Sequence, residues 1–119
     1  MMHDIKITTG ELLDRITILK LKVLANPVKN NGDQLENLLK LWDEINIQDK
    51  IKVELLKQEL FEVNKYLWSL EDKVRSTEND ETLLECAKLI FKNNIKRNSI
   101  KKDIDKILKS DFYEEKIYN

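Results

Sequence analysis

The feature that most constrains the fold is a hydrophobic seam between residues 49 and 76. Its apolar residues recur at alternating steps of three and four, without an interruption. The members are Val53, Leu56, Leu60, Val63, Leu67, Leu70 and Val74. Such a seam is typical of a long helix that packs along a second long helix. Phe61 and Trp68 form a second, weaker apolar line, so we expect this helix to touch more than one neighbour.

The composition favours helices throughout the chain. Two Gly and one Pro among 119 residues argue against an all-β protein, which would need many turns. We therefore predict an all-α fold, a compact helical bundle of two long antiparallel helices and two shorter N-terminal helices. Residues 1–119 are expected to form a single domain, with an N-terminal arm over 1–8 and a docked tail over 110–119.

Local signals set the expected helix boundaries. The Thr8-Thr9-Gly10-Glu11 stretch has the form of a capping box and predicts a first helix over 9–25, ended by Asn26-Pro27. Residues 30–33 read as a turn, so the second helix is expected to begin at Asp33. The third helix is predicted over 49–76. The fourth is predicted from residue 79 or 80 to about 109.

Charge and hydropathy narrow the function classes. The formal net charge is -1, so the chain lacks the excess of basic residues with which a protein neutralises nucleic-acid phosphates. We therefore expect no nucleic-acid binding. No run of eighteen apolar residues is present, so we expect no membrane insertion. The N-terminus lacks the apolar core of a signal peptide, and a single cysteine fits a reducing compartment. We predict a cytoplasmic protein.

The fourth predicted helix carries polar residues where its buried stripe should be. The stripe consists of Leu83, Ala87, Ile90, Asn94, Arg97, Lys101, Ile104 and Leu108. The first helix is apolar nearly all round, so its charged residues should be partly desolvated and need partners. We predict a polar layer inside the bundle, formed by Glu11, Asp14, Arg15, Glu71, Arg75, Asn94, Arg97 and Lys101, with Lys20 and Asn98 as further candidates. In the alternative, the fourth helix turns residues 94–101 to solvent and buries Phe91, Ile95 and Ile100.

Few chemistries suit these residues. One His and one Cys cannot furnish a zinc site, Cys86 lies in an apolar helical segment, and no glycine-rich phosphate loop is present. We predict no metal and no cofactor, and the sequence favours a role other than catalysis. Arg15, Arg75, Arg97 and Lys101 could still converge on an anion, with Asn94 or Asn98 donating. A closed network, in which acidic residues already neutralise these cations, is the favoured alternative.

Surplus aromatic surface suggests a partner. Trp42, Phe61, Tyr66 and Trp68 offer more apolar surface than one partner helix can cover, which is typical of an oligomer or protein interface. Packing among the four helices is the competing explanation. We predict a binding or assembly protein. The alternative is a protein or enzyme that binds a small anion (phosphate, a sugar nucleotide or a dicarboxylate) in a cationic pocket between the first, third and fourth helices.

Four stretches resemble one family of short bacterial and phage-borne helical proteins, classed only as a domain of unknown function. They are GELLDRITILKLK (10–22), LWSLEDKVR (67–75), IFKNNIKRNSIKKDI (90–104) and YEEKIY (113–118). The resemblance implies a compact helical fold and an association with glycosyltransferase or polysaccharide genes, but no chemistry. Ile117 stands where relatives often have Ser. The positions that match the family pattern are Glu11, Asp14, Arg15, Thr17, Lys20, Glu71, Asp72, Arg75, Asn94, Arg97, Lys101, Glu114, Glu115 and Lys116.

Overall fold

The computed structural model describes residues 2–108 and 113–118, with side chains over 7–108. Its elements in chain order are β1 (Met2–Ile7), α1 (Thr9–Ala25), α2 (Lys29–Asp43), α3 (Lys50–Ser76), α4 (Asp80–Leu108) and β2 (Tyr113–Tyr118). The predicted all-α fold class, a compact helical bundle, is confirmed by the four helices. The two short strands are an addition that the sequence pattern did not predict.

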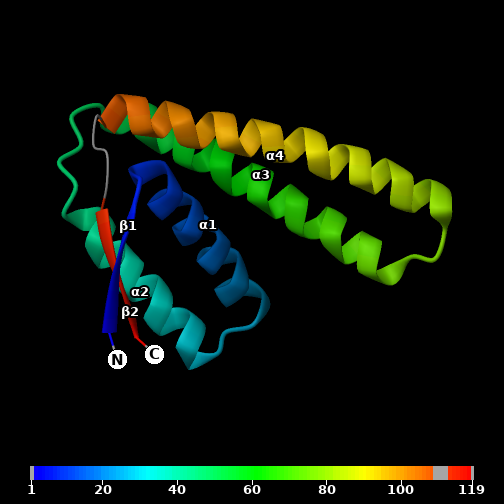
Figure 1. Cartoon of the computed structure of the whole chain (residues 1–119), viewed down its shortest axis with the longest axis horizontal. Helices are drawn as coiled ribbons and strands as arrows, with labels where there is room; N and C mark the ends of the chain where they lie inside the picture. The colour runs from blue at the N-terminus through cyan, green and yellow to red at the C-terminus, as the bar shows by residue number, and fades with distance from the viewer. Residues whose placement is uncertain (1, 109–112, 119) are drawn as a thin grey trace.

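The two longest helices, α3 and α4, form an antiparallel hairpin joined by residues 77–79, as predicted (Figure 1). At one end of the hairpin, α1 packs against both of its helices, and α2 lies along α1. The other end, where α3 ends and α4 begins, extends beyond α1 and α2 (Figure 1). The molecule therefore has a thick end of several helices and a thin end of two.

Side-chain caps explain where three helices begin. The Thr8 hydroxyl accepts from the Glu11 backbone N–H at 3.1 Å, so the predicted start of α1 is confirmed. Asp49 caps α3 through the Lys52 N–H at 3.1 Å, and the Asn79 side chain accepts from the Thr82 N–H at 3.0 Å. Each cap satisfies a backbone donor that has no partner inside its own helix.

The predicted start of α2 was wrong. The helix begins at Lys29, directly after Pro27-Val28, and not at Asp33, so the expected turn over 30–33 is helical. Asn and Gly are poor helix formers, with Gly costing about 1 kcal/mol relative to Ala. The apolar face of the helix outweighs this preference, because Leu35, Leu38 and Trp42 pack on the core beside α1.

The two ends of the described chain pair with each other. β1 and β2 form an antiparallel two-stranded sheet in which Met2 is opposite Tyr118 and Ile7 is opposite Tyr113. The predicted N-terminal arm is a strand, and Ile7 is buried. Part of the predicted tail is a strand, whereas residues 109–112 and 119 lie outside the described residues.

The core has two parts, one on each side of α1. On one side Leu12 and Ile16 pack with Leu38 and Ile45. On the other side Leu13 packs among seam residues of α3 and buried residues of α4, namely Leu60, Val63, Leu67, Ile100 and Ile104. The expectation that α1 is buried among other helices is therefore confirmed, and its polar residues must find partners inside the molecule.

Candidate functional site

The centre of the predicted polar layer is Asp14, a residue of α1 with no exposed surface (0%). Arg97 of α4 holds both carboxylate oxygens: its Nε donates to Oδ1 at 2.9 Å and its Nη2 donates to Oδ2. The side-chain amide of Asn64, on α3, also donates to Oδ1 at 2.9 Å. One buried carboxylate thus joins three helices, and bidentate pairing with a guanidinium fixes their relative rotation.

Asn64 and Thr17 complete this centre, although sequence reasoning did not place either in the layer. The Asn64 amide also lies 2.7 Å from the Thr17 hydroxyl oxygen, and that hydroxyl donates to the Asp14 carbonyl oxygen at 2.7 Å. All three residues are buried. Among the described residues, every buried side-chain nitrogen and oxygen has a partner. An uncharged amide next to a seam residue gives no charge signal, which is why Asn64 was missed.

A second group of charges extends the layer toward solvent. The Lys101 ammonium of α4 pairs with the Glu11 carboxylate of α1 and lies 3.9 Å from the nearer oxygen of Asp14. The Arg15 guanidinium lies 3.4 Å from the other oxygen of Glu11. Burial raises the pKa of Glu11, but the hydrogen bond and the charge of Lys101 outweigh burial and hold that pKa below its ordinary value.

The charges of the layer balance. Hydrogen bonds from Arg97 to Asp14 raise the pKa of the guanidinium, against the effect of burial, and the negative charges of Asp14, Glu11 and Glu71 add to the rise. The three carboxylates of Glu11, Asp14 and Glu71 therefore act on the three cations of Arg15, Arg97 and Lys101. Such an arrangement holds its cations through its own acids.

Asn94 belongs to this network at its edge, since its amide oxygen lies 3.5 Å from the Arg97 guanidinium. The three remaining predicted residues, Arg75, Asn98 and Lys20, do not join the layer. Arg75 pairs with Asp72 on the surface of α3, because the two stand one helical turn apart. Asn98 is exposed, since it stands one residue past the stripe. Of the alternative stripe of α4, Ile100 is buried as that stripe predicted, whereas Phe91 and Ile95 are exposed.

Lys20 points to a different part of the molecule. It lines a groove between α1 and α3 together with Glu54 and Lys57. Burial lowers the pKa of Lys20, and the nearby charge of Lys57 lowers it further. Lys20 lies six residues, or about 1.7 turns, beyond Asp14 on α1. Its side chain therefore lies beside the early part of α3 and not in the layer.

A close crossing of α1 and α4 sets the geometry of the network. The Gly10 N–H donates to the Asp105 carboxylate at 2.6 Å, and the Thr9 hydroxyl donates to the same oxygen at 3.0 Å. A Cβ atom on Gly10 would overlap the backbone carbonyl oxygen of Lys101. Only glycine permits this approach, which brings the first turn of α1 within reach of the Lys101 side chain.

A groove runs beside the network between α1, α3 and α4. It holds about 290 Å³ and is lined by Ile18, Leu21, Lys22, Asn64, Leu67, Trp68, Glu71, Arg75, Asn94 and Arg97. The groove thus combines an aromatic ring, apolar side chains, three basic groups and one carboxylate. The sequence placed a candidate anion pocket between the same three helices. The structure adds Trp68 and Lys22 to its wall.

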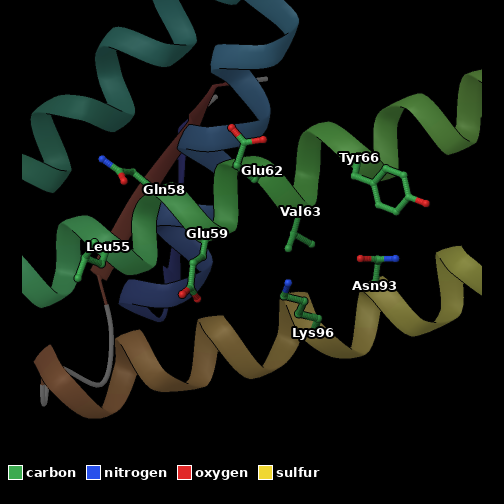
Figure 2. Close-up of a pocket in the computed structure, with 8 residues that line it drawn as sticks. All are labelled: Leu55, Gln58, Glu59, Glu62, Val63, Tyr66, Asn93 and Lys96. Atoms are coloured by element: carbon green, nitrogen blue, oxygen red, sulfur yellow. The ribbon is translucent and has the colours of Figure 1, made fainter.

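A second groove lies between α3 and α4 and holds about 370 Å³. Figure 2 shows Glu59 and Tyr66 reaching from α3 toward α4, while Asn93 and Lys96 reach from α4 toward α3. Glu62 and Gln58 also line it, and in this view their side chains point away from α4 (Figure 2). The groove mixes both charge signs and is open to solvent. It presents no group of converging charges of one sign.

Comparisons of the chain with protein-family models, with curated proteins and with solved structures give no match. Within the described residues, no three His, Cys, Asp or Glu side chains gather as ligands for a metal ion. None of the described helices combines the length and apolarity needed to cross a membrane. Cys86 is a buried free thiol on α4.

Proposed function

We propose that this chain is a binding or assembly protein in which the α3–α4 hairpin is the binding element and the polar network is structural. The observation that carries the proposal is the apolar outward face of α4. Phe91 is 70% exposed, Leu84 58% and Ile95 57%. Exposed apolar residues that share one helix face are typical of protein interaction sites, whereas single ones are ordinary.

The state of the network supports a structural role. Arg97 already donates to both oxygens of Asp14, and Lys101 is paired with Glu11. A cation that is held in this way would have to give up a buried partner to bind a ligand, and a buried carboxylate without a partner is costly. The network therefore fixes how α1 sits on the hairpin.

Site-specific photo-cross-linking tests the binding role. A benzophenone amino acid replaces Phe91 in one variant and exposed Asn37 on α2 in the control. Irradiation of the purified protein and of its native cells should give cross-linked products from position 91 only, with the partner identified by mass spectrometry. Equal labelling from both positions, or no product from position 91 in either setting, would contradict the proposal.

The groove beside the network favours a second candidate function, the binding of a small anion. Arg75 and Lys22 line this groove without being part of the buried network, and Trp68 offers a ring on which a planar group could stack. This ligand would be phosphate, a sugar nucleotide or a dicarboxylate. The groove is open to solvent.

A thermal-shift series separates these ligands. Phosphate, a sugar nucleotide and a dicarboxylate are added in separate arms, and a specific ligand should raise the melting temperature as its concentration passes the dissociation constant. The shift should disappear in Arg75→Ala and persist in Lys40→Ala, a control on α2. Arg97→Ala is unsuitable for this test because it would disturb the fold. No shift with any of the three anions would exclude this second function.

A further inference from the structure

The outward face of α4 has a regular pattern of apolar residues. Successive residues of an α-helix turn by about 100°, which places Leu84, Phe91 and Ile95 within about 40° of one another around the axis. The buried residues Cys86 and Ile100 lie on the opposite side, against the core. This face is thus the part of α4 farthest from the residues that hold the helix in the bundle.

The charges beside this stripe are sorted by sign along the helix. Glu81 and Glu85 flank it on one edge near the start of α4, and Lys92 and Lys96 flank it on the same edge further on. All four are exposed, and within residues 7–108 none of them forms an ion pair. Like charges four residues apart repel each other along a helix. The edge therefore begins with two acidic residues and ends with two basic ones, and exposed Lys88 stands between them, closer to the stripe.

This charge pattern matches that of an identical helix running in the opposite direction, because acidic residues then face basic ones. In an antiparallel pair of identical helices related by a two-fold axis, the same edge of each helix faces its counterpart. With the axis between residues 89 and 90, Leu84 lies opposite Ile95 of the other copy. The acidic residues of each edge then lie beside the basic residues of its partner, and the aliphatic stem of Lys88 lies opposite Phe91.

We propose that two copies of this chain associate through the outward faces of their α4 helices, in an antiparallel arrangement. This inference rests on the proposed function, since it names the partner of the hairpin as a second copy. Charge complementarity along the edge favours a second copy as the partner. The acidic residues of one edge face the basic residues of the same edge in an antiparallel copy, and an unrelated partner would not require this arrangement. The stripe would supply the buried centre of the contact, and the charged edge would set its direction.

The first test is the mass of the purified protein in solution. Light scattering coupled to gel filtration should give twice the chain mass at high concentration and a monomer on dilution, over a range from about 1 µM to about 1 mM. Phe91→Asp should abolish the dimer. Leu24→Asp, which changes an equally exposed apolar residue on α1, should leave it unchanged. Circular dichroism of both variants shows whether the fold is retained.

A charge exchange tests the antiparallel register. Lys92→Glu/Lys96→Glu makes the whole edge acidic, and Glu81→Lys/Glu85→Lys makes it basic. Each variant alone should dimerise at least about tenfold more weakly than the parent, because like charges then face each other at both ends of the contact. An equimolar mixture of the two variants should recover a heterodimer. Recovery would not be expected from a parallel pair or from an unrelated contact surface.

Several results would overturn the inference. They are a monomer over the whole concentration range, a dimer that survives Phe91→Asp in a folded protein, and a mixture of the charge variants that stays monomeric. A monomer in solution combined with a cross-link from position 91 to a different protein would overturn the homodimer and leave the proposed function in place. The absence of any cross-link from position 91 would overturn both the homodimer and the proposed binding function.

Discussion

The chain contains two arginine–aspartate pairs whose surroundings differ. Arg97 and Asp14 are 83 residues apart, and their pair joins α4 to α1 with the Asp14 side chain fully buried and the Arg97 side chain partly buried. Arg75 and Asp72 are three residues apart, and their pair lies exposed at the thin end of the hairpin. Similar chemistry therefore serves two purposes. The first pair fixes how helices pack, whereas the second is an ordinary surface contact.

The two ends of the hairpin differ in the same way. At the thick end, α1 crosses α4 so closely that glycine is required, and polar groups are matched one by one. At the thin end, α3 and α4 have only each other, and apolar side chains of α4 face solvent. Local stability should follow this division, since regions with few buried contacts open most readily.

The largest expected effect is the loss of the buried pair. Arg97→Met should lower the free energy of unfolding by up to about 3 kcal/mol, because the buried Asp14 carboxylate loses its bidentate partner and keeps only the Asn64 amide and the Lys101 ammonium 3.9 Å away. Urea denaturation at neutral pH measures the change. The double variant Asp14→Leu/Arg97→Met should recover part of the loss, since it removes both charges. A single variant that loses less than about 1 kcal/mol would contradict the buried network.

Two glycines test the close crossing of α1 and α4. Gly10→Ala should destabilise the protein by about 1–3 kcal/mol, because the new methyl group overlaps backbone that cannot rotate away. Gly32→Ala is the matched control: nothing lies within 4 Å of its Cβ position, and it stands inside α2. That change should stabilise by about 0.5–1 kcal/mol through helix propensity. Equal signs for the two variants in thermal unfolding would refute the close approach.

Acidic pH should weaken the outer part of the network. The pKa of Glu11 is lowered in the folded protein, so its contribution to stability is complete above its ordinary value of 4.5 and is lost as the pH falls through the folded value. Glu11→Gln should flatten the pH dependence of unfolding below about pH 5, by at most about 1 kcal/mol, because the pair is partly solvated. Glu36→Gln on α2 is the control. An unchanged slope in Glu11→Gln would exclude this coupling.

The smallest effect is expected at the thin end. Arg75→Met removes the exposed pair with Asp72 and should change the free energy of unfolding by no more than about 0.5 kcal/mol. The same urea measurement used for Arg97→Met gives a direct comparison of the two arginines. If Arg75→Met lowered the free energy of unfolding as much as Arg97→Met, the thick and thin ends of the hairpin would be equally constrained, and the proposed difference between them would be wrong.

Individual residues show how far sequence reasoning reached. The Thr8 cap and the Asn26-Pro27 stop defined α1, because both act on their own neighbours in the chain. The polar layer was anticipated from three polar residues in the stripe of α4. Its uncharged members were not predicted, because the role of an amide such as Asn64 depends on the residues that it contacts in the folded protein. The α2 start was missed because tertiary packing outweighed local helix propensity.

The sequence by itself determined where most helices run and that the two longest pair. Each of these follows from short-range periodicity and caps. Only the tertiary structure decided that Asp14 would bind Arg97, that Gly10 would touch α4, and that residues 2–7 would pair with residues 113–118. Partners this far apart in the chain depend on the relative rotation and depth of packed helices, which no local pattern specifies.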